Sequence, residues 1–249
     1  MSQVRIIPVL LLKDGGLYKT VRFAKDNYVG DPINTVKIFN EKEADELVLL
    51  DYHASRDKRA PDFRKIAEIA GEAFMPMAYG GGIDSLETAR KVFDGGFEKV
   101  VLNSVLPNNL SILREIGNIY GAQSVVAGID VKRNFFGKQK VYSVSGTRKT
   151  DLDPVEWART LEEAGAGEIF LNSIDRDGTW EGYDIPLIKA VSAAVRIPVV
   201  ACGGAGSMAD FEKAVREGGA SAVAAGSLFV YQRKGMGVLV NFPAQKIRI

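Results

Sequence analysis

The sequence has one cysteine, Cys202, and one histidine, His53. A lone cysteine cannot form a disulfide within the chain, and these two residues cannot supply the ligands of a zinc site. We therefore expect no metal and no cofactor. Cys202 is interpreted as a small apolar side chain that fills a turn. His53 is expected to pack or to hydrogen-bond near the end of a strand.

The chain also lacks an excess of charge and a long apolar run. Its 32 lysines and arginines nearly balance its 31 aspartates and glutamates, so we expect no nucleic-acid partner and no membrane partner. The apolar run at residues 6–12 is too short to cross a membrane, and no cleavage site of small residues follows it. These absences predict a cytoplasmic protein.

A regular alternation of short apolar runs and amphipathic segments is what the chain does contain. Its 249 residues, 46% of them hydrophobic, can bury one large core. The predicted strands are 5–11, 46–51, 75–79, 99–103, 124–130, 168–172, 197–201 and 222–226. Buried parallel strands separated by helices predict an α/β fold, a single (β/α)8 TIM barrel over residues 1–249.

The sequence repeats itself with an offset of 122 residues, which carries Asp31-Pro32 to Asp153-Pro154 and Gly81-Gly82 to Gly203-Gly204. In each Asp-Pro pair, aspartate is a typical N-cap and proline suits the first helical turn. The repeat predicts two half-barrels, about residues 1–122 and 123–249. Residues 131–149, rich in lysine, arginine, glycine and serine, form an insert that predicts a long loop or hairpin over a site.

Glycine-rich turns follow the predicted third and seventh strands, at Gly81-Gly82 and Gly203-Gly204. The fourth and eighth strands end in Asn103-Ser104 and Gly226-Ser227. Glycine lets backbone N–H groups approach an anion, and the following helix N-terminus adds partial positive charge. Two such clusters at opposite sides of a barrel mouth predict a ligand with two phosphate groups. The alternative is that glycine serves only the tight turns.

Short motifs spread along the chain also carry a family likeness. They are Arg5-Ile-Ile-Pro, Lys13-Asp-Gly15, Gly30-Asp-Pro, Ala44-Asp-Glu-Leu, Gly80-Gly-Gly-Ile, Ile174-Asp-Arg-Asp-Gly-Thr179, Gly182-Tyr-Asp and Gly203-Gly-Ala-Gly206. This set resembles the HisF family, the cyclase subunit of imidazole glycerol phosphate synthase. The resemblance implies a barrel that receives ammonia at its bottom from a HisH-like glutaminase and closes an imidazole ring at its top.

The resemblance also adds Lys19, Asp177 and Gly178 to the residues expected near the phosphates. Lys19 falls in the predicted loop after the first strand. Its alternative interpretation is a solvated loop charge.

Ring closure in the family depends on two aspartates, one on the first strand and one on the fifth. Asp130 matches the second, but alignment of the two strands places Leu11 where the first is expected. Loss of a positioned acid or base typically costs a factor of about 10² to 10⁴ in rate. We expect cyclase activity to be lost and Asp130 to be a remnant, unless Asp51 or Asp177 substitutes for the missing acid.

The family likeness further implies a ring of charged residues that gates ammonia entry at the barrel bottom. It maps onto Arg5, Glu46, Lys99 and Glu168, two of each sign, on inward-facing positions. Inward charges are costly to bury unless they are paired, so a salt-bridged plug is the alternative. Glu98, beside Lys99, is expected at the surface, in contact with a glutaminase or with solvent.

Three further segments resemble a paralogous group, the AglZ-type HisF homologues of acetamidino sugar modification. They are Lys19-Thr-Val-Arg-Phe23, Asp26-Asn-Tyr-Val-Gly30 and the stretch from Phe229 to Pro243. That group is associated with a HisH-like glutaminase and an N-acetyl sugar amidotransferase. The likeness implies a subunit that supports glutamine-dependent acetamidino modification of a sugar for surface polysaccharide or glycan, and Leu11 fits it.

Two other functions stay open from the sequence. One is the cyclase subunit of histidine biosynthesis, and the other is a non-enzymatic scaffold that binds a phosphorylated small-molecule ligand.

Overall fold

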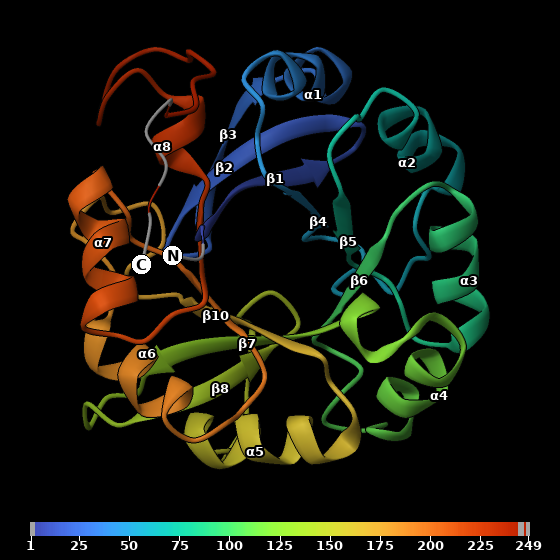
Figure 1. Ribbon diagram of the computed structural model, residues 1–249, viewed down its shortest axis with the longest axis vertical. Coiled ribbons are helices and arrows are strands. Elements are labelled where there is room, and N and C mark those ends of the chain that lie inside the picture. Colours follow the sequence, from blue (N-terminus) through green and yellow to red (C-terminus); the bar gives the residue numbers. More distant parts are fainter. Residues whose placement is uncertain (1–2, 244–246, 248–249) are drawn as a thin grey trace.

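The computed structural model, which describes residues 3–243 and 247, is a closed barrel of parallel strands inside a ring of helices (Figure 1). The strands adjoin in the order β1, β4, β5, β6, β7, β10, β11, β12, and β12 pairs with β1. Their bounds are β1 Arg5–Lys13, β4 Leu47–Asp51, β5 Met77–Gly80, β6 Lys99–Leu102, β7 Val125–Arg133, β10 Glu168–Ser173, β11 Val199–Cys202 and β12 Ala222–Ala225. The predicted (β/α)8 barrel is confirmed.

The helices that connect these strands cover the outside of the barrel. They are α1 Pro32–Glu41, α2 Phe63–Ala70, α3 Leu86–Asp94, α4 Ser111–Tyr120, α5 Pro154–Ala164, α6 Ile185–Ser192, α7 Met208–Arg216 and α8 Ser227–Val230, with a 3-10 turn η1 Ala122–Ser124. Asp31 caps α1 by accepting from Asn34 N at 2.9 Å, and Asp153 caps α5 by accepting from Val155 N at 2.9 Å. The repeated Asp-Pro pair thus begins a helix in both places, as predicted. No described helix is long and apolar enough to span a bilayer.

Two antiparallel hairpins stand on the rim of the barrel. β2 Gly16–Val21 and β3 Ala24–Gly30 follow β1, while β8 Gln139–Ser143 and β9 Arg148–Lys149 follow β7. The second hairpin lies within the predicted insert. The first was not expected, and the placement of Lys19 in a loop is wrong because Lys19 lies on β2. The turn residues Arg22 and Phe23 have positive φ without the glycine or asparagine that usually signals such a turn.

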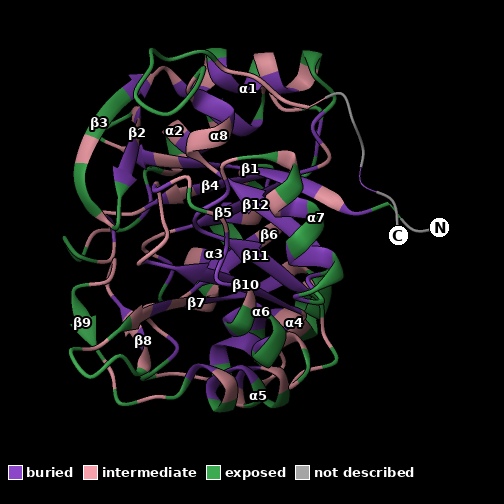
Figure 2. Cartoon of the chain, turned by 90° about the vertical axis from the view of Figure 1, so that its left-hand side faces the viewer, coloured by how far each residue is buried: buried purple, intermediate pink, exposed green. Residues whose placement is uncertain are grey.

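Apolar side chains fill the barrel interior as well as the layer between strands and helices. The barrel strands are accordingly mostly buried (Figure 2). The interior cluster consists of Ile7, Val9, Val48, Ala78, Val101, Val126, Phe170, Val200, Cys202, Ala222 and Ala224. Because side chains alternate along a strand, Ile7 and Val9 share the inward face of β1 with Arg5 below them and Leu11 above. The apolar interior therefore lies between a charged lower end and an open upper end.

Candidate functional site

A cavity of about 190 Å³ opens at the carboxyl ends of the barrel strands. All the residues predicted near phosphate line it: Lys19, Gly81, Gly82, Asn103, Ser104, Asp177, Gly178, Gly203, Gly204, Gly226 and Ser227. Leu11 and Asp130 line the same cavity. The fold thus gathers strand ends and glycine-rich turns from both halves of the chain around one space, where catalytic and ligand-binding residues of such barrels usually lie.

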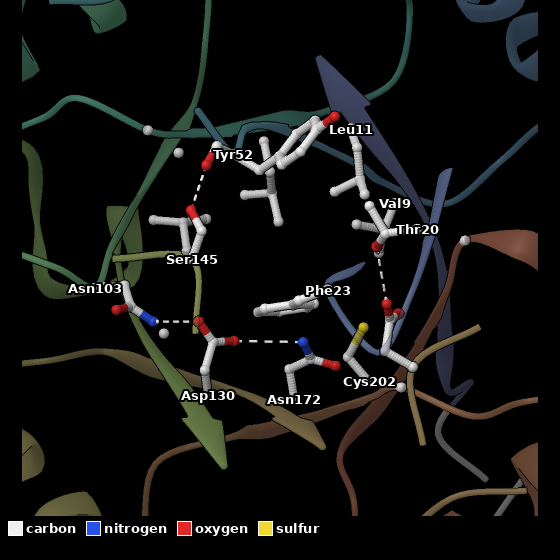
Figure 3. A pocket seen from close by; sticks show the side chains of 18 of the residues that line it. Val9, Leu11, Thr20, Phe23, Tyr52, Asn103, Asp130, Ser145, Asn172 and Cys202 are labelled. Carbon is white, nitrogen blue, oxygen red and sulfur yellow. Dashed lines mark hydrogen bonds between the residues drawn. The ribbon is translucent and has the colours of Figure 1, made fainter. Parts of the chain in front are cut away.

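Asp130 faces this cavity from β7 and is held by two side-chain amides (Figure 3). Asn103 Nδ2 donates to Asp130 Oδ2 at 3.0 Å, and Asn172 Nδ2 donates to Oδ1 at 3.3 Å. Burial raises the pKa of the Asp130 carboxyl group to about 7, even though the two amide hydrogen bonds favour the charged form. This group can therefore gain or lose a proton near neutral pH.

Leu11 occupies on β1 the place that Asp130 occupies on β7. Each residue precedes the turn of a rim hairpin, and each pairs with the next barrel strand, Leu11 with Leu50 and Asp130 with Asn172. The cavity consequently has one wall with a carboxyl group and amides, and another wall with two leucines. The strand register therefore places Leu11 and Asp130 at equivalent positions of the two half-barrels, as the sequence predicts.

Lys19 and Asp177 form a second polar group on the cavity wall. Lys19 is 5% exposed, its Nζ donates to the carbonyl oxygen of Val9, and a Cβ at Gly226 would overlap that Nζ. Burial lowers the pKa of the Lys19 ammonium to about 8. Gly226 therefore provides the space for this ammonium. Because Lys19 is buried, the alternative that it is a solvated loop charge is wrong.

The carboxylate of Asp177 accepts a hydrogen bond from Thr20 Oγ1 at 3.1 Å. Burial raises the pKa of Asp177 to about 6, while the charge of Lys19 opposes that rise. Asp51, the other carboxylate considered as a substitute acid, forms a two-point ion pair with Arg59 at 2.8 and 2.9 Å. The Asp51 carboxylate is thus occupied by its ion pair with Arg59. Asp177 has no such ion pair among the described residues, and its raised pKa belongs to a carboxyl group that lines the cavity.

The glycine-rich turns adopt the left-handed backbone that favours glycine, with φ of +117° and +69° at Gly81-Gly82 and +89° and +114° at Gly203-Gly204. A Cβ at Gly81 would overlap the carbonyl oxygen of Asp51, and one at Gly203 would lie 2.7 Å from the carbonyl oxygen of Ser173. Close packing of the two turns accounts for glycine at these positions without a ligand. Phosphate binding there stays a prediction.

Two hairpin tips lie at the mouth of the cavity. The second belongs to the insert that the sequence predicts over a site, whereas the first was not expected. Phe23 of the first hairpin and Ser145 of the second line the cavity (Figure 3). Ser145 Oγ donates to the carbonyl oxygen of Tyr52, and a Cβ at Gly146 would lie 2.9 Å from the Phe23 ring. Positive φ at Val144, a β-branched residue, marks backbone strain of the kind found at functional sites.

The single cysteine and the single histidine differ in their surroundings. Cys202 belongs to the apolar interior cluster, and burial raises the pKa of its thiol, in agreement with its interpretation as an apolar filler. It is the last residue of β11, however, and does not lie in a turn. His53 Nδ1 lies 2.7 Å from Arg56 Nη2, just after β4. Within residues 3–243 and 247, no three histidine, cysteine or carboxylate side chains are grouped as metal ligands would be.

At the opposite end of the barrel, four charged side chains form a closed ring of ion pairs. Lys99 Nζ lies 2.9 Å from Glu46 Oε1 and 3.0 Å from Glu168 Oε2, and Arg5 donates to both carboxylates. The two carboxylates are 6% exposed, so the cations offset a large desolvation cost. Glu98 is exposed and its Oε2 accepts from Met77 N at 2.7 Å. The structure therefore brings together all four residues predicted for the lower end.

Comparisons with known proteins agree with this arrangement. A family model described as histidine biosynthesis protein matches residues 5–235. A Pseudomonas aeruginosa chain named "Putative imidazole glycerol phosphate synthase subunit hisF2" is 54% identical over 243 residues, which cover 98% of this chain and 97% of that one. A Leptospira interrogans chain named "Putative imidazole glycerol phosphate synthase subunit HisF" is 45% identical over 244 residues, 98% and 96% of the two chains.

A third relative, from Alkaliphilus metalliredigens, is named "Imidazole glycerol phosphate synthase subunit HisF" and is 43% identical over 231 residues, 93% of this chain and 92% of its own length. These similarities extend over nearly the whole barrel, including the strands that carry the cavity and the ionic ring. The chain belongs to the histidine biosynthesis protein family and, within it, to the HisF group.

Proposed function

We propose that this chain is the ammonia-handling subunit of a glutamine-dependent system that converts an acetamido group of a sugar into an acetamidino group. The observation that carries the proposal is the combination of Leu11 at the upper end with an intact ionic ring at the lower end. An acid that ring closure needs is replaced by a side chain that can neither accept nor donate a proton. The four charged residues expected to admit ammonia are present and paired with one another.

The path for ammonia would run from the ionic ring through the barrel interior to the cavity. Val48, Val101 and Phe170 belong to the interior cluster, and Leu11 packs against it. An apolar lining disfavours ammonium more than neutral ammonia, because the charged form loses its hydration. The nucleophilic form would therefore be the one that reaches the cavity.

Ring and cavity each suggest a partner. A HisH-like glutaminase would dock at the lower end and release ammonia at the ring of Arg5, Glu46, Lys99 and Glu168. An N-acetyl sugar amidotransferase would receive ammonia at the upper end. The cavity would hold a phosphorylated small molecule between its two glycine-rich turns, with the ammonium of Lys19 beside Gly226 as the charged contact.

The second candidate is the cyclase reaction of imidazole glycerol phosphate synthase, and Asp177 is the observation that favours it. Its carboxyl group lines the same cavity as Asp130 and has a pKa raised by burial to about 6. Two carboxyl groups that titrate near neutral pH could share acid and base roles. The printed names of the relatives also refer to this synthase.

Two experiments separate the candidates. In the first, the chain, a HisH-like glutaminase and an N-acetyl sugar amidotransferase are mixed with glutamine and an acetamido sugar, and amidine formation is followed by mass spectrometry. We expect product in the complete mixture and a loss of coupling between glutaminase turnover and product for Lys99→Ala. The matched variant Lys91→Ala, on the exposed face of α3, should couple normally.

In the second experiment, the chain is expressed in a histidine auxotroph that lacks the cyclase. We expect no growth. Growth would contradict the proposal that Leu11 abolishes cyclase activity. Normal coupling in Lys99→Ala, together with ligand-dependent assembly of the complex, would instead support a non-enzymatic scaffold.

A further inference from the structure

The second rim hairpin is strongly basic, whereas the rest of the chain is net acidic. Residues 131–150, here called the basic hairpin, contain six lysines and arginines and no aspartate or glutamate. The whole chain has a net charge of +1, so the remainder is net acidic. The basic hairpin is therefore a local cationic feature on an otherwise acidic molecule, which is the pattern of a surface that selects a partner of opposite charge.

Two phenylalanine rings project from the tip of this hairpin. Phe135 is 98% exposed and Phe136 is 84% exposed, and their rings meet edge to face with centroids 5.6 Å apart. Asn134 Oδ1 accepts from Phe136 N and Lys138 N at 3.0 Å each, which braces the turn beneath them. This turn keeps two large apolar rings exposed to water, although their burial would be favourable. Exposed apolar groups of this kind are typical of a docking surface without its partner.

Most of the lysines and arginines of the basic hairpin form no ion pair within the described residues. Five of the six, Lys132, Lys138, Lys140, Arg148 and Lys149, have no carboxylate within ion-pair distance among residues 3–243 and 247. Of these, Lys140 Nζ donates to the Asp151 carbonyl oxygen and Lys132 Nζ lies 5.9 Å from the centroid of the Tyr142 ring. Arg133 differs, because it pairs with Asp184 at 3.3 Å. Two exposed aromatic rings fit the centre of an interface, in which aromatic residues are enriched, and unpaired cations on the same hairpin fit a rim that attracts an acidic partner.

The basic hairpin also reaches the mouth of the cavity. Its inner turn contributes Ser145 and Thr147 to the cavity lining, while its outer tip is exposed at the rim (Figure 2). Phe135 lies five residues beyond Asp130, so it is at most about 17 Å away along the strand. A standard interface buries about 800 Å² per partner and is about 30 Å across. One partner seated on the tip would therefore also cover the mouth.

We infer that the basic hairpin, with Phe135 and Phe136 at its tip, is the docking surface for an acidic protein partner that caps the upper end of the barrel. This inference rests on the proposed function, in which that partner is the N-acetyl sugar amidotransferase. A protein fits the position better than a lipid surface does, because a bilayer across the rim would block a water-soluble sugar substrate and its enzyme from the mouth.

The test measures the affinity of the purified, full-length chain for a purified N-acetyl sugar amidotransferase by isothermal titration calorimetry at low and high salt. The double variant Phe135→Ser/Phe136→Ser should weaken binding about 30-fold or more, as loss of an interface hot spot does. Lys138→Glu/Lys149→Glu should weaken it about 10-fold and reduce its salt dependence. Phe74→Ser is the matched control, because Phe74 is also exposed, at 91%, but precedes β5 at the other end of the barrel.

Equal affinity of the wild type and both hairpin variants would overturn the inference. So would binding of the wild type to vesicles containing about a third phosphatidylserine but not to the amidotransferase, which would assign the hairpin to a membrane surface. Failure of the inference is distinct from failure of the proposed function. Amidine formation that persists without hairpin-dependent binding rejects the docking surface alone, whereas hairpin-dependent binding without amidine formation rejects the assigned reaction.

Discussion

Replacement of Lys99 by methionine tests whether the ring at the base of the barrel is one coupled electrostatic unit. The substitution roughly preserves the length of the side chain and removes the ammonium that lies 2.9 Å from Glu46 Oε1 and 3.0 Å from Glu168 Oε2. Both carboxylates are 6% exposed, so solvent cannot replace the lost cation. Each carboxylate keeps its contact with Arg5.

The size of the effect follows from this geometry. Removal of one partner of a buried ion pair costs about 3–5 kcal/mol, because an uncompensated charge stays behind. Since Arg5 still serves both carboxylates, we expect the unfolding free energy to fall by about 2–3 kcal/mol. In a domain of this length each kcal/mol lowers Tm by about 2–4 °C, so Tm should fall by roughly 4–12 °C.

Calorimetric unfolding at pH 7 measures this change, with Lys91→Met as the control. Lys91 Nζ lies 2.9 Å from Glu87 Oε1, the same separation as in the ring, but both of these side chains are exposed. Exposed ion pairs contribute little to stability, so the Tm of the control variant should stay unchanged. Equal Tm values for the Lys99 and Lys91 variants would refute the view that the ring is a buried, coupled unit.

Three further predictions concern the cavity. Leu11→Asp adds a like charge to the cavity and should raise the pKa of Asp130 above its present value of about 7. Carbon-13 NMR of the Asp130 carboxyl group measures this pKa, and an unchanged value would contradict the placement of the two residues. The folded-state pKa of Asp130 lies above the ordinary value of 3.8, so the folded chain binds the extra proton and stability should fall as pH rises from about 4 to 7. Asp130→Asn should flatten that slope by at most about 1.4 kcal/mol per pH unit in urea unfolding, and an identical slope would contradict the shift. Gly226→Ala should displace the Lys19 ammonium and weaken binding of inorganic phosphate about 10-fold in calorimetric titration, whereas equal affinity would remove Lys19 from the phosphate site.

Strand periodicity and the internal repeat were enough to predict the barrel, because buried parallel strands leave continuous apolar runs in a sequence. The hairpin of β2 and β3 escaped prediction for a physical reason. Its turn uses Arg22 and Phe23 at positive φ, and tertiary contacts rather than local preference hold them there: Arg22 N donates to the Asp177 carbonyl oxygen at 2.9 Å. Val144 and Ser145, 122 residues later, also have positive φ. These residue types rarely adopt such a backbone, so the second turn was likewise not predictable from its local sequence.

Site prediction succeeded where residue type and strand position were sufficient and failed where long-range contacts decide. The inward register placed Arg5, Leu11 and Asp130 correctly, since side-chain alternation is a local property. Burial of Lys19 and the ion pair of Asp51 with Arg59 depend on how distant loops pack. The sequence alone therefore left Asp51 and Asp177 as equal substitutes for the missing acid, and the structure distinguishes them.

Nitrogen transfer through the barrel can be measured directly by isotope retention. The chain, the glutaminase and the amidotransferase are supplied with glutamine labelled with ¹⁵N in its amide, in a buffer that contains excess unlabelled ammonium. We expect the new amidine nitrogen to keep the label of glutamine, and no imidazole product to form. An amidine labelled only to the level of the bulk ammonium, or formation of the imidazole ring by this chain, would contradict a barrel that conducts ammonia without ring-closing power.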